Sequence, residues 1–585
     1  MGKDTIRYQT LGQMYEKYGV EELKEINKFL FKVLSISGLR PAGLEIPTSA
    51  GKLSNRKADR IKWALGCLKD VYVLKYIYQK MMDPVEQAAI EELIHGTDTL
   101  DFEQFKAKYG KLPDMSLKGN YYRRRSSQDY YFPQVNLFIE SDYIPEDIRK
   151  LFKDFVKQPQ EVQSKTIDEL PETVELYKGE SRAYDAELVR HSTAQVAISD
   201  LQAMLRLADQ GKIKVGAKTG HPTNASCKSI LKVLSNGDLY PEDIAPDDDY
   251  DEVTIGDAGI RPFAWVMLLL AGGLVKINGS KLELTRNGKA ALKKPAHEVL
   301  KHLWGRWLKN KNFHELRRVN IIKGQKSKKR PLYTAVDGRY SLEDALYELE
   351  PDKWIKTDDF FTFLVSGGLG FSIVRNAWPL YIGDSHYGSL GYGSTGWDKH
   401  IEGRFARAFL LEYAATLGLI DVALVPPWGS TNDHGDLWYP GELSCLSRYD
   451  GLYAFRLNSL GAWILNPEEE YIPHSKNESG FTVTDNMEIT ALNGLDELSS
   501  SDRLFLDRFS TPKSDNIWKL TLDKLLLAVE EGVELREIGE FLAARNQGVL
   551  PEAVEDLLED VNQRICVLEN KGDAVLIQCK EKGLA

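Results

Sequence analysis

The residues whose types and spacing best fit a chemical task are the lysines and arginines between positions 317 and 330. Arg317 and Arg318 are followed by a dense cationic run, made up of Lys323, Lys326, Lys328, Lys329 and Arg330. Several cations beside phosphates bind nucleic acid in a salt-dependent, sequence-independent way. A solvated loop between domains is the alternative, although a basic run is unusual in a chain whose net charge is −11. We take this run as the first candidate nucleic-acid-binding segment.

Two further groups could contact nucleic acid. Arg123, Arg124 and Arg125 lie between two pairs of tyrosines, which combines charge with rings that can stack on bases; partner binding and ordinary packing are the alternatives. The second group leads into a predicted helix after Pro222, where side chains could meet phosphates or base edges; a capped structural helix is its alternative. Its members are Lys212, Lys214, Lys218, Thr219, His221, Thr223, Asn224, Ser226 and Lys228.

Catalytic chemistry has weaker candidates. The Gly-rich segment 383–397 contains Asp384 and His386, and the segment 432–436 contains Asp433, His434 and Asp436. A metal-dependent nuclease built on either segment is an alternative to structural loops and turns. The glycines do not follow a dinucleotide-binding spacing, and no Gly-x-x-x-x-Gly-Lys-Ser/Thr phosphate loop occurs, so an ATPase is not expected. We expect no catalytic residue, metal or cofactor.

The elements that must position these residues follow a pattern that occurs twice. In residues 263–293 an apolar helix leads to two alternating runs around Asn278-Gly279, a hairpin signal, and then to a second helix. The order recurs over residues 405–465 with a longer insertion. In both copies a glycine, Gly288 or Gly461, stands four residues after the leucine that ends the second strand. The pattern predicts two winged-helix modules.

The flanking regions are predicted to be helical. Helices are expected over 11–35, 56–80 and 84–95, and the first two resemble a small SAP-type helix-loop-helix. Residues 158–180 have the composition of a linker. Near the C-terminus, helices over 522–529, 535–543 and 551–564 and a hairpin through Val567 and Val575 have an order that is again similar to a winged helix.

Length and composition exclude other classes. A chain of 585 residues is expected to form roughly three to five domains. The longest apolar run, 263–271, is far shorter than the roughly 20 residues of a membrane span, and the N-terminus lacks a secretory pattern, so we expect a cytoplasmic protein with no membrane partner. The five cysteines are scattered, which argues against a zinc or disulfide framework.

Two stretches carry a family resemblance. Residues 200–226, which include Lys218-Thr-Gly-His-Pro, and residues 518–561, which include Glu540-Phe-Leu-Ala-Ala-Arg, resemble bacterial helicase-associated proteins. The C-terminal part of those proteins is similar to the N-terminal, DNA-engaging domain of XPB-type helicases. The resemblance implies DNA transactions in repair or antiphage defence, beside a helicase encoded separately.

The expected fold is α+β, mainly α: a multi-domain array of winged-helix modules with small β-hairpins. The expected divisions are an N-terminal helical region (1–157), a linker (158–185), a first winged-helix domain (186–310), a basic connector (311–340), a second winged-helix domain (341–478) and a domain like the XPB N-terminal domain (479–585). The expected function is that of a non-catalytic, DNA-binding scaffolding subunit whose partners are DNA and a helicase or nuclease supplied in trans. A transcriptional regulator is a further alternative.

Overall fold

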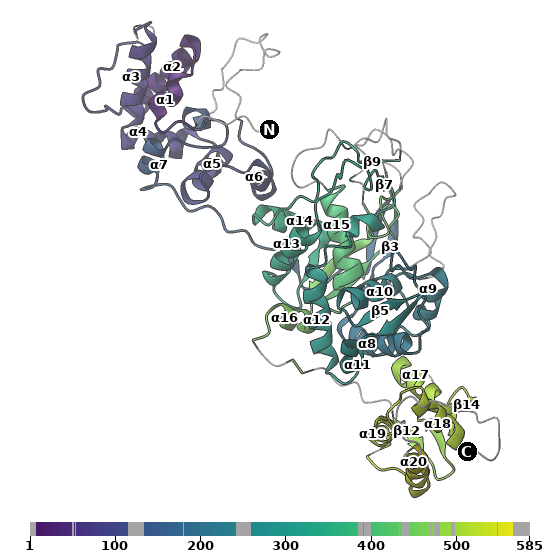
Figure 1. Cartoon of the computed structure of the whole chain (residues 1–585). Coiled ribbons are helices and arrows are strands. Elements are labelled where there is room, and N and C mark those ends of the chain that lie inside the picture. Colours follow the sequence, from purple (N-terminus) through teal and green to yellow (C-terminus); the bar gives the residue numbers. More distant parts are fainter. Residues whose placement is uncertain are drawn as a thin grey trace, which may run out of the picture.

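The computed structural model describes residues 7–49, 52, 54–114, 134–178, 181–241, 259–383, 390, 399–431, 433, 444–468, 471–472, 480–492, 498–546 and 548–565. About 47% of the chain is helical and about 13% lies in strands of small sheets, which confirms the α+β class. N-terminal, central and C-terminal units follow one another along the chain and in space (Figure 1). Each unit has its own cluster of buried apolar side chains.

The N-terminal unit is a group of short helices around one core. Its helices are α1 (Leu11–Glu16), α2 (Val20–Ser37), α3 (Lys57–Leu68), α4 (Val71–Tyr76), the π-helical η2 (Ile77–Met81), α5 (Pro84–His95), α6 (Phe102–Tyr109) and α7 (Glu146–Phe152), with a 3-10 turn, η4 (Gln134–Leu137). Thr10 and Asp83 form capping boxes, and Pro84 occupies the first turn of α5, where its missing N–H would have no partner. These end signals explain why α1 and α5 begin where they do.

The central unit is built on a five-stranded antiparallel sheet. In spatial order the strands are β1 (Thr166–Ile167), β8 (Trp354–Lys356), β11 (Leu452–Leu457), β10 (Ile420–Leu424) and β4 (Val189–His191). A hairpin of β2 (Thr173–Lys178) and β3 (Ser181–Glu187) precedes β4. The segment expected to be a linker, 158–185, contains β1, which pairs with the distant β8, and most of the β2–β3 hairpin.

Residues 194–291 contain three helices and a hairpin. The elements are α8 (Ala194–Asp209), α9 (Asn224–Leu231), α10 (Arg261–Ala271), β5 (Val275–Asn278), β6 (Lys281–Leu284) and α11 (Arg286–Ala291). Lys214, between α8 and α9, forms a β-bridge with Lys281, so a third short chain segment lies beside the hairpin. Gly279 has a φ of +61°, but Asn278 pairs with Lys281, so the two turn residues are Gly279 and Ser280, one position after the predicted Asn-Gly turn.

The rest of the central unit surrounds this group. Its helices are α12 (Ala296–Leu308), α13 (Val336–Tyr347), α14 (Thr357–Ser366), α15 (Glu402–Ala408), the π-helical η6 (Phe409–Ala414) and α16 (Ser459–Leu465), with a 3-10 turn, η5 (Glu315–Arg318). The strands β7 (Ile322–Lys323) and β9 (Tyr381–Ile382) form a separate pair. Helix α6 of the N-terminal unit packs against α14, where the side-chain amide of Gln104 donates to the carbonyl of Ser366 at 3.2 Å.

The two copies of the sequence repeat share a local geometry. A Cβ on Gly288 or on Gly461 would collide with the carbonyl oxygen of the leucine that precedes the first strand of its copy, so only glycine fits. The N–H of each glycine donates to the residue that caps the following helix: Thr285 Oγ1 at 3.1 Å, or Asn458 Oδ1 at 3.0 Å. The copies differ in that β5 and β6 form a hairpin of their own, whereas β10 and β11 belong to the five-stranded sheet.

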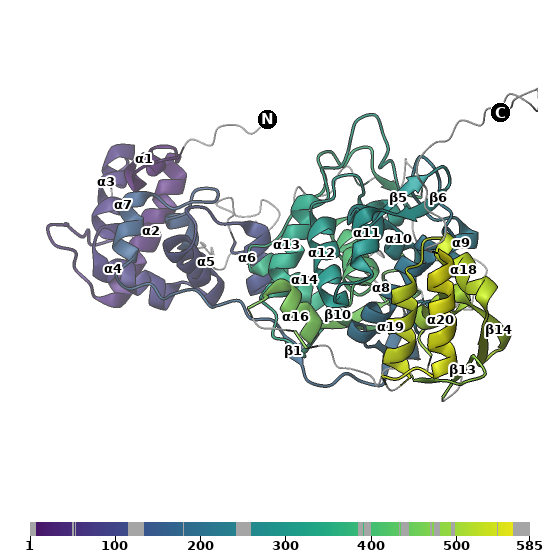
Figure 2. The same cartoon turned by 60° about the horizontal axis from the view of Figure 1, so that its bottom comes forward.

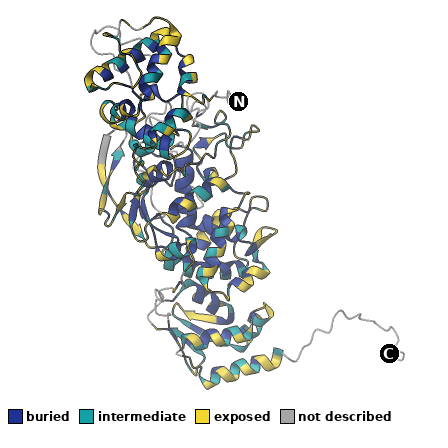
Figure 3. Ribbon diagram, turned by 90° about the vertical axis from the view of Figure 1, so that its left-hand side faces the viewer, coloured by how far each residue is buried: buried dark blue, intermediate teal, exposed yellow. Residues whose placement is uncertain are grey.

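The central unit has one continuous core. Buried apolar side chains from Ala197 to Tyr471 form a single cluster, so the regions 186–310, 311–340 and 341–478 share it. Helix α10 is part of this core: each residue from Arg261 to Leu269 is buried, and α9, α12 and η6 pack around the helix. Buried residues fill the interior of the central unit in Figure 3.

The C-terminal unit combines helices with a four-stranded antiparallel sheet. The strand order is β12 (Phe481–Val483), β13 (Glu488–Ala491), β15 (Ile517–Leu520) and β14 (Ser510–Ser514). Helices α17 (Ser500–Phe509), α18 (Leu522–Glu530), α19 (Leu535–Arg545) and α20 (Glu552–Ile565) pack beside it (Figure 2). The last three agree with the predicted helices, and the hairpin predicted through Val567 and Val575 lies outside the described residues.

Candidate nucleic-acid interface

The basic loop, which we define as residues 323–330, is held firmly on the surface of the central unit. Its first residue belongs to β7, which pairs with β9. The amide of Gln325 donates to the carbonyl oxygens of Leu316, Val319 and Ile322 at 2.9, 3.3 and 2.9 Å. Gly324 has a φ of +81° and lies so close to Pro379 that a Cβ would collide with its carbonyl oxygen. The loop is therefore tied to both η5 and the segment before β9.

The cations of the basic loop point to solvent. All five predicted residues are exposed: Lys323, Lys326, Lys328, Lys329 and Arg330. No aspartate or glutamate occurs in the sequence between Glu315 and Asp337. Within the described part of the chain, no ion pair involves any of the five. Their charge is thus available to an anionic partner.

The structure brings part of the second predicted group close to this loop. His221 lies before α9, and its ring is 6.0 Å from the ring of Phe313, just before η5. Partial burial of this ring, followed by the positive charges of Arg318, Lys326 and Arg317, lowers the pKa of His221. Lys218, before α9, and Lys228, within it, are also exposed. Two basic segments separated by about a hundred residues therefore meet.

Other members of that group have structural tasks. Thr223 caps α9, and the buried hydroxyl of Ser226 both accepts from the N–H of Lys214 at 2.7 Å and donates to its carbonyl at 2.9 Å. Thr219 Oγ1 accepts from the N–H of His221 within a turn. The side chains of Lys214 and Lys212 are exposed, and Lys214 lies directly opposite Lys281 across the β-bridge. Like charges in that position destabilise each other unless an anion lies near them.

Three residues beside the basic loop were not predicted from the sequence as part of the interface. Leu332 forms a bridge with Val374, which places Tyr333 next to Arg375, and the guanidinium carbon of Arg375 is 5.0 Å from the centre of the Tyr333 ring. Trp378 follows in the same segment and is 60% exposed. The sequence offers one weak signal for them: residues 360–383 contain no aspartate or glutamate. This segment, however, contains only one cation, Arg375.

The remaining predicted residues do not join this surface. Arg123, Arg124 and Arg125 lie outside the described residues, as do Asp384, His386, His434 and Asp436. Asp433 is described, and its carboxylate accepts from the guanidinium of the buried Arg404 at 2.7 Å. That carboxylate is therefore occupied by an ion pair. Among the described residues no group of three or more histidine, cysteine or acidic side chains could hold a metal ion.

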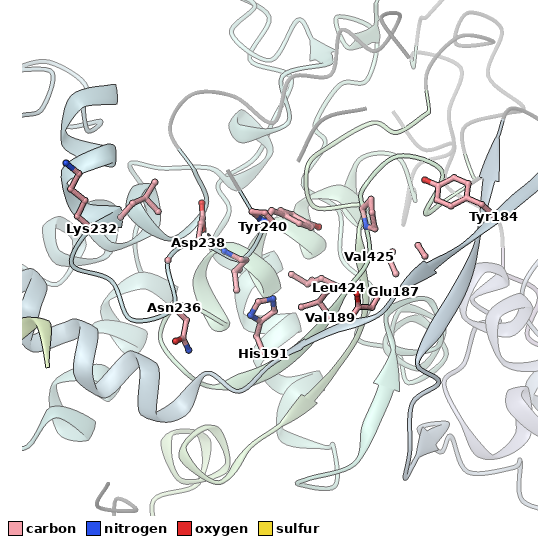
Figure 4. Close-up of a pocket in the computed structure, with 16 residues that line it drawn as sticks. Tyr184, Glu187, Val189, His191, Lys232, Asn236, Asp238, Tyr240, Leu424 and Val425 are labelled. Atoms are coloured by element: carbon pink, nitrogen blue, oxygen red, sulfur yellow. Dashed lines mark hydrogen bonds between the residues drawn. The ribbon is translucent and has the colours of Figure 1, made fainter. Parts of the chain in front are cut away.

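A cavity of about 720 Å³ lies elsewhere in the central unit, between β3, β4, the end of α9 and the end of β10. Its wall is mainly apolar. Figure 4 shows His191 near the middle of the lining, with Lys232 and Tyr184 at opposite ends. Burial and the charge of Arg261 lower the pKa of His191, and its buried Nε2 has no hydrogen-bond partner among the described residues. Asp238 in the same wall is engaged by backbone N–H groups, including that of Ile260 at 2.8 Å. The lining thus suits a small, mainly apolar molecule.

Comparison with known proteins adds no family: no protein-family model matches the sequence, and no curated protein shows significant similarity to it. None of the described helices combines the length and the apolar character needed to cross a membrane.

Proposed function

We propose that this protein is a non-catalytic nucleic-acid-binding and scaffolding subunit, active in the cytoplasm with a helicase or nuclease supplied by another chain. The observation that carries the proposal is the basic loop: exposed cations without acidic neighbours in sequence, held rigidly beside the basic segment around α9. A fixed array of cations gains more from binding phosphates than a mobile one, because less conformational entropy is lost. The DNA repair or antiphage role that the resemblance implies is part of this proposal.

The proposal includes a winged-helix assignment for residues 194–284. The order helix, β-bridge, helix, helix and hairpin supports it, as does the repeated glycine geometry in residues 402–465. The exposed parts of the first module are its hairpin and the residues around α9, whereas α10 is buried. Nucleic acid would therefore meet the edge of the module through its phosphates, without a helix inserted into a groove.

The test is a charge reversal. The variant K326E/K328E/K329E/R330E is compared with the control K69E/K150E/K153E/K157E. The control reverses the charge of four exposed lysines, which lie in the N-terminal unit and in the segment directly after it. Fluorescence anisotropy with a labelled oligonucleotide at several salt concentrations measures Kd. We expect the first variant to weaken binding strongly and to reduce the slope of log Kd against log salt by about 3, and the control to keep both. Equal binding by the two variants would show that the basic loop does not bind nucleic acid.

The same samples test the absence of catalysis. We expect the oligonucleotide to stay intact with Mg²⁺, Mn²⁺ or Zn²⁺ present. Metal-dependent cleavage that survives purification would instead assign a nuclease to this chain.

A further inference from the structure

The basic loop is one side of a larger surface. We define the ring-and-cation surface as Lys323, Lys326, Arg330, Tyr333, Arg375 and Trp378. It is formed by two chain segments, 322–333 and 373–382, which run side by side: β7 pairs with β9, and the N–H of Tyr333 donates to the carbonyl of Ile373 at 2.9 Å. The N–H of Arg375 donates back to the carbonyl of Pro331 at 2.7 Å. The side chains of this surface are thus carried on a fixed backbone.

Two aromatic rings on this surface are exposed to solvent. Tyr333 is 46% exposed and Trp378 is 60% exposed, and Trp378 is the only exposed tryptophan among those described. The guanidinium of Arg375 lies over the Tyr333 ring and is a third planar group beside the two aromatic rings.

We propose that the ring-and-cation surface binds single-stranded nucleic acid, with unpaired bases stacked on Trp378 and Tyr333 and phosphates held by the basic loop. This inference rests on the proposed function and specifies its substrate. Proteins that bind single strands combine a cationic track with aromatic platforms, because every base offers a flat face. Duplex nucleic acid hides those faces inside its stack, so the rings would have no task there.

The burial of α10 supports the same choice. Duplex DNA is commonly recognised by a helix that enters the major groove, and the helix that precedes the hairpin of this module is closed off by α9, α12 and η6. What the described surface offers instead is cations and rings, with Lys323 adjacent to Tyr381 in the β7–β9 pair. This combination fits a strand whose bases are already unstacked.

The experiment compares Kd for a 20-nucleotide oligo(dT), an oligo(U) of the same length and a blunt 20-base-pair duplex. W378A and Y333A are each expected to weaken single-strand binding by about 5- to 100-fold. W378F should retain most of the affinity, because a ring remains. Y347A removes a tyrosine of α13 with 54% exposure and should bind as the unchanged protein does. Thermal melting of each variant confirms that it is folded.

The slope against salt separates this inference from the proposed function. The ring variants remove no charge, so we expect them to change Kd while leaving the salt slope unaltered. Tighter binding of the duplex, with W378A and Y333A neutral, would overturn the single-strand inference and leave nucleic-acid binding standing. Absence of salt-dependent binding to all three oligonucleotides would overturn both.

Discussion

Arg317 and Arg318 are neighbours in η5 and have opposite environments. Arg317 is exposed near the basic loop, whereas Arg318 donates to the buried carboxylate of Glu412 at 2.9 Å and lies 3.8 Å from the centre of the Phe263 ring. The charge of Arg318 is therefore neutralised by a buried ion pair, whereas Arg317 presents its charge to solvent. No local pattern distinguishes the two, because Glu412 lies 94 positions away in sequence.

His314, at the start of the same turn, makes stability depend on pH. Burial, with the charges of Arg339 and Arg317, lowers its pKa from 6.5 to about 3, and its Nδ1 accepts from the N–H of Leu316. Between pH 6.5 and 3 the unfolded chain binds a proton at this residue and the folded chain does not. Stability is therefore lost as the pH falls through this range, by at most about 1.4 kcal/mol per pH unit.

The prediction is that H314Q flattens this dependence. Denaturant midpoints of the unchanged protein and of H314Q, measured from pH 7 to pH 5, should converge as the pH falls, because the variant has no group to protonate. H302Q, at an exposed histidine of α12, serves as the control and should follow the unchanged protein. Parallel curves for H314Q and the unchanged protein would show that His314 is not held neutral by the fold.

At the scale of elements, the β7–β9 pair decides where the basic loop lies. Gly324, directly after β7, has a positive φ and lies against the carbonyl of Pro379, two residues before β9. We predict that G324A separates the two segments and weakens nucleic-acid binding about 10-fold or more, since the cations and rings no longer share one rigid surface. Binding anisotropy measures the change.

G305A is the matched control for this substitution. Gly305 lies within α12, and a Cβ there would meet no atom within 4 Å. Alanine in a helix interior is more favourable than glycine by roughly 0.5–1 kcal/mol, so this variant should melt slightly higher and bind normally. If G324A also bound normally, the pairing of β7 with β9 would not matter for the interface.

Elements were predictable from the sequence where their own residues define their ends. α5 begins at a capping box with proline in its first turn, and the hairpin between β5 and β6 turns at Gly279, which has a positive φ, so both follow from local rules. β1 and β4 have two and three residues, too few for an alternating pattern, and they form only because partners from distant segments lie beside them. The basic loop was predictable from its composition, whereas its tyrosine and tryptophan neighbours depend on the pairing of segments about 40 to 60 residues apart.

At the scale of the whole molecule, the C-terminal unit packs on the central unit mainly through α17 against α8, and Leu504 of α17 belongs to the central core. The guanidinium of Arg206 lies 3.8 Å from the centre of the Phe505 ring, and the amide of Gln210 donates to the carbonyl of Leu504 at 3.1 Å. Arg508 and Asp209 form an ion pair across the same contact. Mixed contacts of this kind are typical of units that can separate.

We predict that R206A loosens this attachment without unfolding either unit. Loss of the cation–π contact with Phe505 and of the ion pair with Glu537 should raise the separated fraction by about 2- to 30-fold. Limited proteolysis should then release the C-terminal unit faster by cleavage between α16 and β12. R503A, at an exposed arginine of α17, is the control and should be cut at the original rate. Identical cleavage rates for R206A and the unchanged protein would show that the contacts of Arg206 do not hold the two units together.

The buried α10 also limits how this molecule can be divided. Residues 194–284 look like a module that could be expressed alone or fused to another protein. Cut out of the chain, that module would expose the apolar side chains of α10 that pack against α12 and η6 here. Exposed apolar surface of that extent causes aggregation. The smallest part that could be expressed alone or fused to another protein is therefore the whole central unit with its shared core. A protein that received only residues 194–284 would also need elements that cover α10, as α12 and η6 do here.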